Sequence, residues 1–91
     1  MIRSNNRKKI KSNYYKDIVR TLADVLMPVT SADIAGLIGG NRKKVRDAIN
    51  YERNNGSEFI IVEKDPNNKN RNTYSIDRDY YNDWVKKNGP I

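Results

Sequence analysis

The first block of apolar residues follows the spacing of one buried helix face. Its apolar positions recur close to i, i+3, i+4 and i+7, the period of an amphipathic helix. They are Tyr15, Ile18, Val19, Leu22, Ala23, Val25 and Leu26. Asn13 precedes this stripe and is a residue type that caps helices, and Pro28 follows it. The pattern predicts a helix that begins at Asn13, runs to about Met27 and is ended by Pro28.

A second, short helix is predicted directly after this proline. Thr30 can act as its N-cap, and Asp33 stands three residues later, as an acidic variant of the capping box requires. Apolar residues continue to Ile38, and the pair Gly39–Gly40 then interrupts the helical pattern. We therefore expect a helix of about two turns that ends in a tight glycine turn.

A third helix is expected to begin at Asn41, which can cap it, and to stop at Asn55–Gly56. Its apolar stripe is narrow and consists of Val45, Ala48 and Ile49. The other positions of its first half are basic or amide side chains, so the charged face of this helix is expected to face solvent.

The second half of the chain predicts a hairpin and a last helix. Residues 59–62 form a β-branched and aromatic run, and residues 72–76 can form a second strand after a long polar tip at 65–70. Asp77 can cap a short helix that ends before residues 88–90. The apolar face of this helix consists of Tyr80, Tyr81, Trp84 and Val85. Aromatic residues at helical spacing favour core packing or a dimer contact over stacking on bases.

Length and composition narrow the function classes. A chain of 91 residues has room for one domain, here predicted to span residues 13–88 after a flexible basic arm at 1–12. No apolar run approaches the roughly 20 residues that cross a bilayer, so we expect a soluble, cytoplasmic protein without a membrane partner. Cysteine and histidine are absent, which removes the usual metal ligands and catalytic triads. We expect no metal, no cofactor, no small-molecule substrate and no enzymatic activity.

The net charge of +7 is concentrated in two places. Residues 1–13 contain five cations and no acid, and residues 41–57 contain five cations against two acids. This distribution favours a polyanionic partner, because each neutralised phosphate releases condensed counterions. A solvated, solubilising set of charges is the alternative that charge alone leaves open.

The order of helix, short helix, glycine turn, basic helix and hairpin resembles the winged helix-turn-helix family. The resemblance covers about residues 14–76, and its core is residues 30–49, TSADIAGLIGGNRKKVRDAI. It implies an α+β fold that is mainly α, with three helices, a two-stranded wing and a short C-terminal helix. It also implies sequence-specific binding of double-stranded DNA, with the helix from Asn41 lying in the major groove.

Within that helix the chemistry suggests different roles. Arg42 and Arg46 can each grip guanine O6 and N7, and Asn50 can bind adenine in the same two-bond manner. Lys43 and Lys44 are expected to contact phosphate. Asn41, at the helix start, completes this set. Asp47 could accept a hydrogen bond from cytosine or pair with a neighbouring cation.

Three further segments are candidate contacts with the DNA backbone or minor groove. Ser31 could hold a phosphate at the start of the second helix, or act only in capping. Lys69 and Arg71 lie in the hairpin tip, which resembles a wing, although an ordinary flexible turn is equally consistent. The arm contributes Arg7, Lys8 and Lys9, with the alternative that it is a solubilising tail.

One position departs from the family pattern. Such third helices usually carry a large apolar residue about three positions beyond Ile49, where this chain has Glu52 beside Tyr51. Either Tyr51 turns inward or the helix is shorter than predicted. The departure makes the placement of Asn50 less certain than that of Arg46.

Two biological roles fit a DNA-binding domain of this kind: a transcriptional regulator, or the origin-recognition domain of a replication initiator. The size and composition suggest a phage, a plasmid or another mobile element. A homodimer on an inverted repeat is expected, acting in the cytoplasm at the nucleoid. The alternatives are a winged-helix protein-interaction module and an RNA-binding domain, the latter needing exposed aromatic residues from among Tyr14, Tyr80 and Tyr81.

Overall fold

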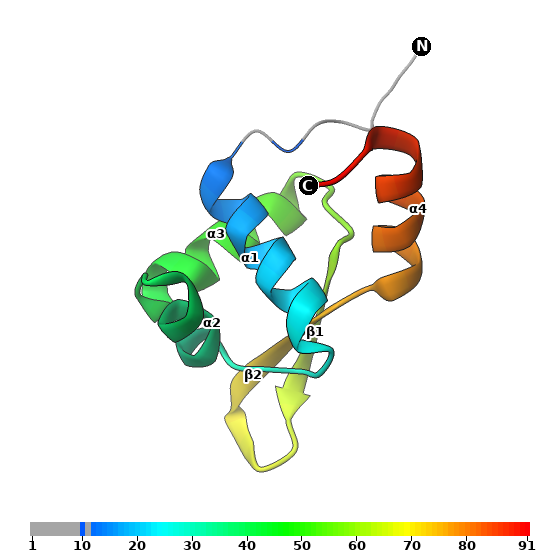
Figure 1. Ribbon diagram of the computed structural model, residues 1–91. Coiled ribbons are helices and arrows are strands. Elements are labelled where there is room, and N and C mark those ends of the chain that lie inside the picture. The colour runs from blue at the N-terminus through cyan, green and yellow to red at the C-terminus, as the bar shows by residue number, and fades with distance from the viewer. Residues whose placement is uncertain (1–9, 11) are drawn as a thin grey trace.

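The computed structural model describes residue 10 and residues 12–91. In this part of the chain four helices and a two-stranded antiparallel hairpin follow one another (Figure 1). In order they are α1 (Asn13–Val25), α2 (Ser31–Ile38), α3 (Arg42–Asn54), β1 (Ile60–Asp65), β2 (Asn68–Ile76) and α4 (Arg78–Asn88). The central α1 has α2 and α3 on one side and α4 on the other, and the hairpin projects away from the helices (Figure 1).

Helix α1 starts and ends slightly differently from the prediction. Its N-cap is Ser12, whose Oγ accepts a hydrogen bond from the Tyr15 backbone N–H at 3.1 Å, so Asn13 is the first helical residue and not the cap. A serine hydroxyl three residues before a free N–H satisfies it well, which displaces the cap by one position. The helix ends at Val25 because Leu26 adopts a left-handed conformation with φ 60°, two residues before Pro28.

The caps of α2 and α3 confirm the predicted helix starts. The Thr30 side chain accepts from the Asp33 N–H, and the Asp33 carboxylate accepts from the Thr30 N–H, which is a complete capping box. Asn41 caps α3 by accepting from the Lys44 N–H at 2.8 Å. Between them Gly39 takes a left-handed conformation with φ 75°, which glycine adopts without steric cost. These local signals fix a short turn between α2 and α3.

The hairpin is longer than predicted and its tip is shorter. β1 pairs with β2 from Ile60–Ile76 to Asp65–Asn68, so the turn itself contains only residues 66–67. The expected tip at 65–70 was therefore wrong in its extent: β2 begins at Asn68, although residues 69–71 have no partner on β1. Strand pairing uses backbone groups, so the polar side chains of Asn68 and Asn72 do not prevent pairing as long as they can face water. Val29 adds a bridge to Tyr74, with hydrogen bonds of 3.0 and 2.7 Å, which ties the α1–α2 loop to β2.

The core lies where α1, α2 and α3 meet the inner face of the hairpin. Its buried apolar members are Tyr15, Ile18, Val19, Leu22, Ile34, Ala35, Val45, Ile49, Phe59, Ile60, Tyr74 and Ile76. Helix α4 closes this core through its aromatic residues: the ring of Phe59 contacts Tyr80 and Trp84 edge-on, at centroid distances of 4.9 and 5.5 Å. The predicted packing role is confirmed for Tyr80, Tyr81 and Trp84.

The N-terminal segment is described only in part. Ile10 is half-buried against the core, and Ser12 caps α1, so both belong to the folded domain. Arg7, Lys8 and Lys9 lie outside the described residues. The observed elements confirm the predicted class, an α+β winged helix-turn-helix with an added C-terminal helix.

Candidate nucleic-acid interface

In its first nine residues, helix α3 keeps its apolar side chains and its charged side chains on different faces. Val45 and Ile49 are 0% exposed, and Ala48 packs partly against the same core. All six polar residues predicted for the DNA-binding face are exposed: Asn41, Arg42, Lys43, Lys44, Arg46 and Asn50. The core therefore holds the helix by one face and leaves the basic side in solvent, as the helical period predicts.

The outermost stripe of α3 follows the i, i+3, i+4, i+7 spacing through Lys43, Arg46, Asp47 and Asn50. Asp47 lies within this stripe and pairs with Lys43, whose Nζ is 2.8 Å from Oδ2. In the free protein Asp47 thus follows the second of its two predicted options, pairing with a neighbouring cation. Exposed pairs of this kind contribute little to stability, so Lys43 can exchange its partner for a phosphate at low cost.

Arg42, Arg46 and Asn50 are the unengaged members of the set. Within the described part of the chain their side chains make no hydrogen bond and no ion pair. The core holds one face of α3 and leaves these guanidinium and amide groups exposed. They can bind base edges without first breaking internal contacts.

Lys44 points to the other flank of α3, where it meets α1. Its Nζ lies over the Tyr14 ring, 4.7 Å from the centroid, which is a cation–π arrangement. The same tyrosine packs against the α2–α3 turn: a Cβ added at Gly40 would lie 2.5 Å from the Tyr14 hydroxyl oxygen. A side chain at position 40 would therefore require Tyr14 to move, and Lys44 is oriented by α1.

The C-terminal half of α3 resolves the departure at Glu52, and both predicted explanations were wrong. Tyr51 is 67% exposed, and the helix extends to Asn54. Instead Glu52 itself occupies the inward position and is partly buried, which raises its pKa. Tyr15 from α1 is 1% exposed and lies near Glu52 and Arg53 of this last turn. Asn50 consequently keeps its exposed position on a regular helix.

Tyr51 is a candidate contact that the sequence pattern did not single out. It is the exposed aromatic side chain of α3 and lies beside the stripe that contains Asp47. The sequence could have identified Tyr51, because it is a large aromatic residue that lies outside the Val45–Ala48–Ile49 stripe. The helical pattern indicated it only as a possible core residue.

Ser31 is the first residue of α2 and is only 8% exposed. At this helix start the capping acceptor is Thr30 Oγ1, which accepts from the Asp33 N–H, and not the Ser31 hydroxyl. A phosphate at the start of α2 could therefore reach the backbone more easily than it could reach the Ser31 hydroxyl.

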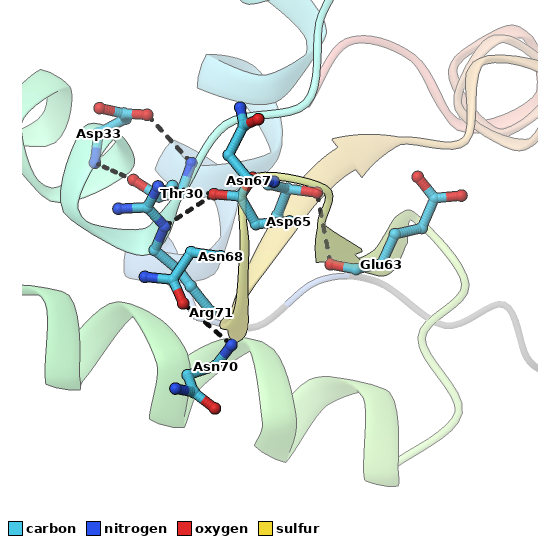
Figure 2. A network of polar contacts seen from close by, with 9 residues as sticks. Thr30, Asp33, Glu63, Asp65, Asn67, Asn68, Asn70 and Arg71 are labelled. Atoms are coloured by element: carbon cyan, nitrogen blue, oxygen red, sulfur yellow. Dashed lines mark hydrogen bonds and ion pairs between the residues drawn. The ribbon is translucent and has the colours of Figure 1, made fainter.

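The wing places its two predicted cations in different situations. Arg71 donates to Asp65 Oδ2 from Nε at 2.8 Å and from Nη2 at 2.6 Å (Figure 2). Lys69 is exposed and, among the residues that the structure describes, has no hydrogen-bond or ion-pair partner. Only Lys69 is thus a free cation of the predicted wing pair.

Metal binding and membrane crossing can also be checked in the described residues. Within residue 10 and residues 12–91, no three acidic side chains gather in a way that could hold a metal ion. None of the helices described is both long and apolar enough to cross a membrane.

Comparison with known proteins supports the architecture. No protein-family model matches the sequence, and no curated protein matches it. Among solved structures, the chain is similar to a point variant of ZitR from Lactococcus lactis, with a TM-score of 0.63 and 18% sequence identity. The match covers 90% of this chain and 53% of ZitR, so the chain spans about half of that protein's length. A likeness at this identity shows the fold.

Proposed function

We propose that this chain binds double-stranded DNA sequence-specifically, with α3 in the major groove. The observation that carries the proposal is the two-sided character of α3. Val45 and Ile49 fix one face in the core, while Arg42, Arg46 and Asn50 stand exposed and, within the described residues, unpaired on the other side. The wide major groove admits one helix, whose N-terminal half reaches base edges.

Each side chain has a role in this proposal that follows from its chemistry. Arg46, in the exposed stripe, is the main reader of guanine, and Arg42 assists it from the first turn. Asn50 reads adenine. Lys43, Lys44 and Asn41 contact the phosphates that flank the groove, which gives affinity and orientation without sequence information.

The biological role proposed is that of a transcriptional regulator or of the origin-recognition domain of a replication initiator, in either case without enzymatic activity. A homodimer on an inverted repeat would place two copies of α3 about one helical turn of DNA apart, which raises both affinity and specificity. We place its action at the nucleoid of a bacterial cytoplasm, with a mobile genetic element as its source.

The three predicted stacking residues give the RNA alternative little support. Tyr14, Tyr80 and Tyr81 were the candidates for base stacking, and all three are half-buried against the core. Recognition of unpaired RNA bases needs freely exposed aromatic faces, and on α3 only Tyr51 offers one. The basic character of α3 likewise supports a nucleic acid over an apolar or basic protein partner.

The direct test is selection of a preferred duplex from a randomised pool, followed by fluorescence anisotropy with Arg46→Ala. The matched control is Lys86→Ala, which removes one exposed positive charge from α4. We expect the selected duplex to bind at least about tenfold better than random DNA, and Arg46→Ala to erase most of that preference, since one two-bond base contact contributes about 1–3 kcal/mol.

Lys86→Ala should weaken binding to both duplexes only slightly and equally. Equal binding of all duplexes by the wild-type protein, abolished at moderate salt, would show that α3 attracts DNA only by its charge, and would overturn the proposal.

A further inference from the structure

The tip of the wing contains a bulge that the hairpin pairing defines. The register steps from Lys64–Asn72 directly to Asp65–Asn68, so residues 69–71 have no counterpart on β1 within the described hairpin. Such extra residues leave the ladder and re-aim the side chains that they carry. Lys69 and Asn70, both exposed, are therefore displayed outside the regular strand.

One carboxylate holds the shape of this bulge. Asp65 Oδ1 accepts a hydrogen bond from the Asn67 backbone N–H at 2.9 Å, and its Oδ2 accepts both donors of Arg71 (Figure 2). The Asp65 side chain is 8% exposed. Asp65 thus joins the turn on one side of the bulge to Arg71 on the other. These hydrogen bonds, first that of Asn67 and then those of Arg71, lower the pKa of Asp65.

A second local contact orders the bulge from within. The Asn68 side-chain oxygen accepts from the Asn70 backbone N–H at 3.0 Å (Figure 2). Side chains that bond the backbone two residues on replace the missing ladder contacts. Residues 65–71 therefore form a closed set of contacts before any ligand is present.

We propose that Asp65 and Arg71 are positioning residues that present Lys69 and Asn70 to DNA, and that Lys69, not Arg71, is the cation of the wing that contacts it. The inference rests on the proposed function. Arg71 holds Asp65 through Nε and Nη2, and turning these two donors to a phosphate would leave a largely buried carboxylate without its cation, which is costly. A tip that is ordered in advance loses less conformational entropy on binding.

The substitution Asp65→Asn separates the two roles of Arg71 by the sign of its effect. It removes a negative charge, so it would tighten DNA binding if it simply released Arg71 to a phosphate. If the pair positions the tip, the same substitution weakens binding. We expect a loss of roughly tenfold on the selected duplex, the order of effect of leaving two tip side chains to be immobilised on binding.

Variants of Arg71 supply a second criterion. Arg71→Gln should weaken binding about as much as Asp65→Asn, and the double variant should be no weaker than either single variant, because both remove the same contact. Arg71→Lys keeps the charge but not the two-donor grip on Asp65, so it should also weaken binding. Near-wild-type affinity of Arg71→Lys, or unchanged or tighter binding by Asp65→Asn, would overturn the inference.

Two lysines of the hairpin provide a matched pair for the contact itself. Lys69→Ala should lower the slope of log affinity against log salt by about 0.9, the value of one phosphate contact. Lys64→Ala removes an equally exposed charge from β1, outside the bulge, and should leave the slope nearly unchanged. Equal effects of both lysines would show a general charge effect and would contradict the assignment.

The same titrations with Arg46→Ala distinguish failure of this inference from failure of the proposed function. If Arg46→Ala leaves duplex preference intact, specific reading by α3 fails. If Arg46→Ala acts as expected but Asp65→Asn does not weaken binding, only the positioning role fails.

Amide hydrogen exchange of Asn67 and Asn70 in the free protein should accelerate in Asp65→Asn while the core amides stay protected. Unchanged exchange at both amides would contradict the positioning role without any DNA present.

Discussion

At the scale of single residues, Tyr15 has the most strongly shifted pKa among the residues that the structure describes. Its ring is 1% exposed beneath the last turn of α3, and its hydroxyl lies 2.6 Å from the Ser57 hydroxyl. Burial raises the pKa of Tyr15 to about 12 from an ordinary value of 10.0, because the phenolate would be poorly solvated.

We predict that the free energy of unfolding falls as the pH rises from 10 to 12. The folded state holds the Tyr15 proton more tightly than the unfolded state, so the contribution is complete below pH 10 and is lost through the folded pKa. The loss should be about 3 kcal/mol, since one pKa unit corresponds to about 1.4 kcal/mol. Urea unfolding at several pH values measures it. Tyr15→Phe is the control, and an equally steep loss in that variant would assign the effect to other groups.

Leu26 is the non-glycine residue with a positive φ in the described part of the chain. It follows α1 in the left-handed region, with φ 60°, and its side chain is 73% exposed. Side chains other than glycine are strained there by about 1 kcal/mol or more. Leu26→Gly should therefore raise the free energy of unfolding by up to about 1 kcal/mol. Leu26→Ala, which keeps the strained conformation, should not, and equal results for the two variants would show that the side chain contributes by packing.

At the scale of elements, the capping box of α2 is the feature on which the helix-turn-helix depends most directly. Thr30 and Asp33 satisfy two backbone donors, and Val29, beside them, bridges to β2. Thr30→Ala should lower the free energy of unfolding by about 1 kcal/mol, the usual cost of removing an N-cap. Thr30→Ser keeps the hydroxyl and should remain close to wild type. Chemical denaturation of both variants tests this, and a loss in Thr30→Ser as large as in Thr30→Ala would contradict a capping role.

In the wing, an ion pair that the sequence did not predict decides which cation is free. Arg71 has the composition of a DNA contact but is engaged by Asp65, six residues earlier. Lys69, between them in the chain, remains exposed. Arg71 and Lys69 are both cationic. They differ in availability because Arg71, and not Lys69, pairs with the Asp65 carboxylate.

At the scale of the whole molecule, the excess positive charge lies in the N-terminal segment and in residues 41–57, which contain α3. Residues 1–9 contain four cations, including Arg7, Lys8 and Lys9, and lie outside the described structure. Removing them leaves Ile10 and Ser12, which pack and cap, in place. We predict that this deletion lowers the salt slope of DNA binding by about 0.9 for each phosphate that the segment neutralises in the full chain, without reducing duplex preference.

Anisotropy titrations across a salt series measure that slope, and a thermal melt checks that the shortened chain still folds. A solubilising role for the segment predicts an unchanged slope. A loss of duplex preference would show instead that the segment reads sequence, as minor-groove arms can.

The sequence alone determined the three helices of the helix-turn-helix and the face of α3 that reaches solvent. These features rest on local rules: Thr30 and Asp33 cap over three residues, Gly39 turns the chain at one position, and the period of Val45 and Ile49 fixes the buried face. Each acts within one or two helical turns, so neighbouring residues suffice to predict it. The short C-terminal helix and its aromatic packing face followed from the same kind of signal.

The tertiary structure alone decided which groups are engaged and which are free. Partly buried Glu52 lies near Tyr15 from α1, and the Lys44 ammonium lies over the ring of Tyr14 from the same helix. The pairing of β1 with β2 sets the bulge that separates Lys69 from Arg71. Hydrogen bonds and burial depend on distances between segments that the chain brings together only on folding, and a linear pattern does not contain those distances.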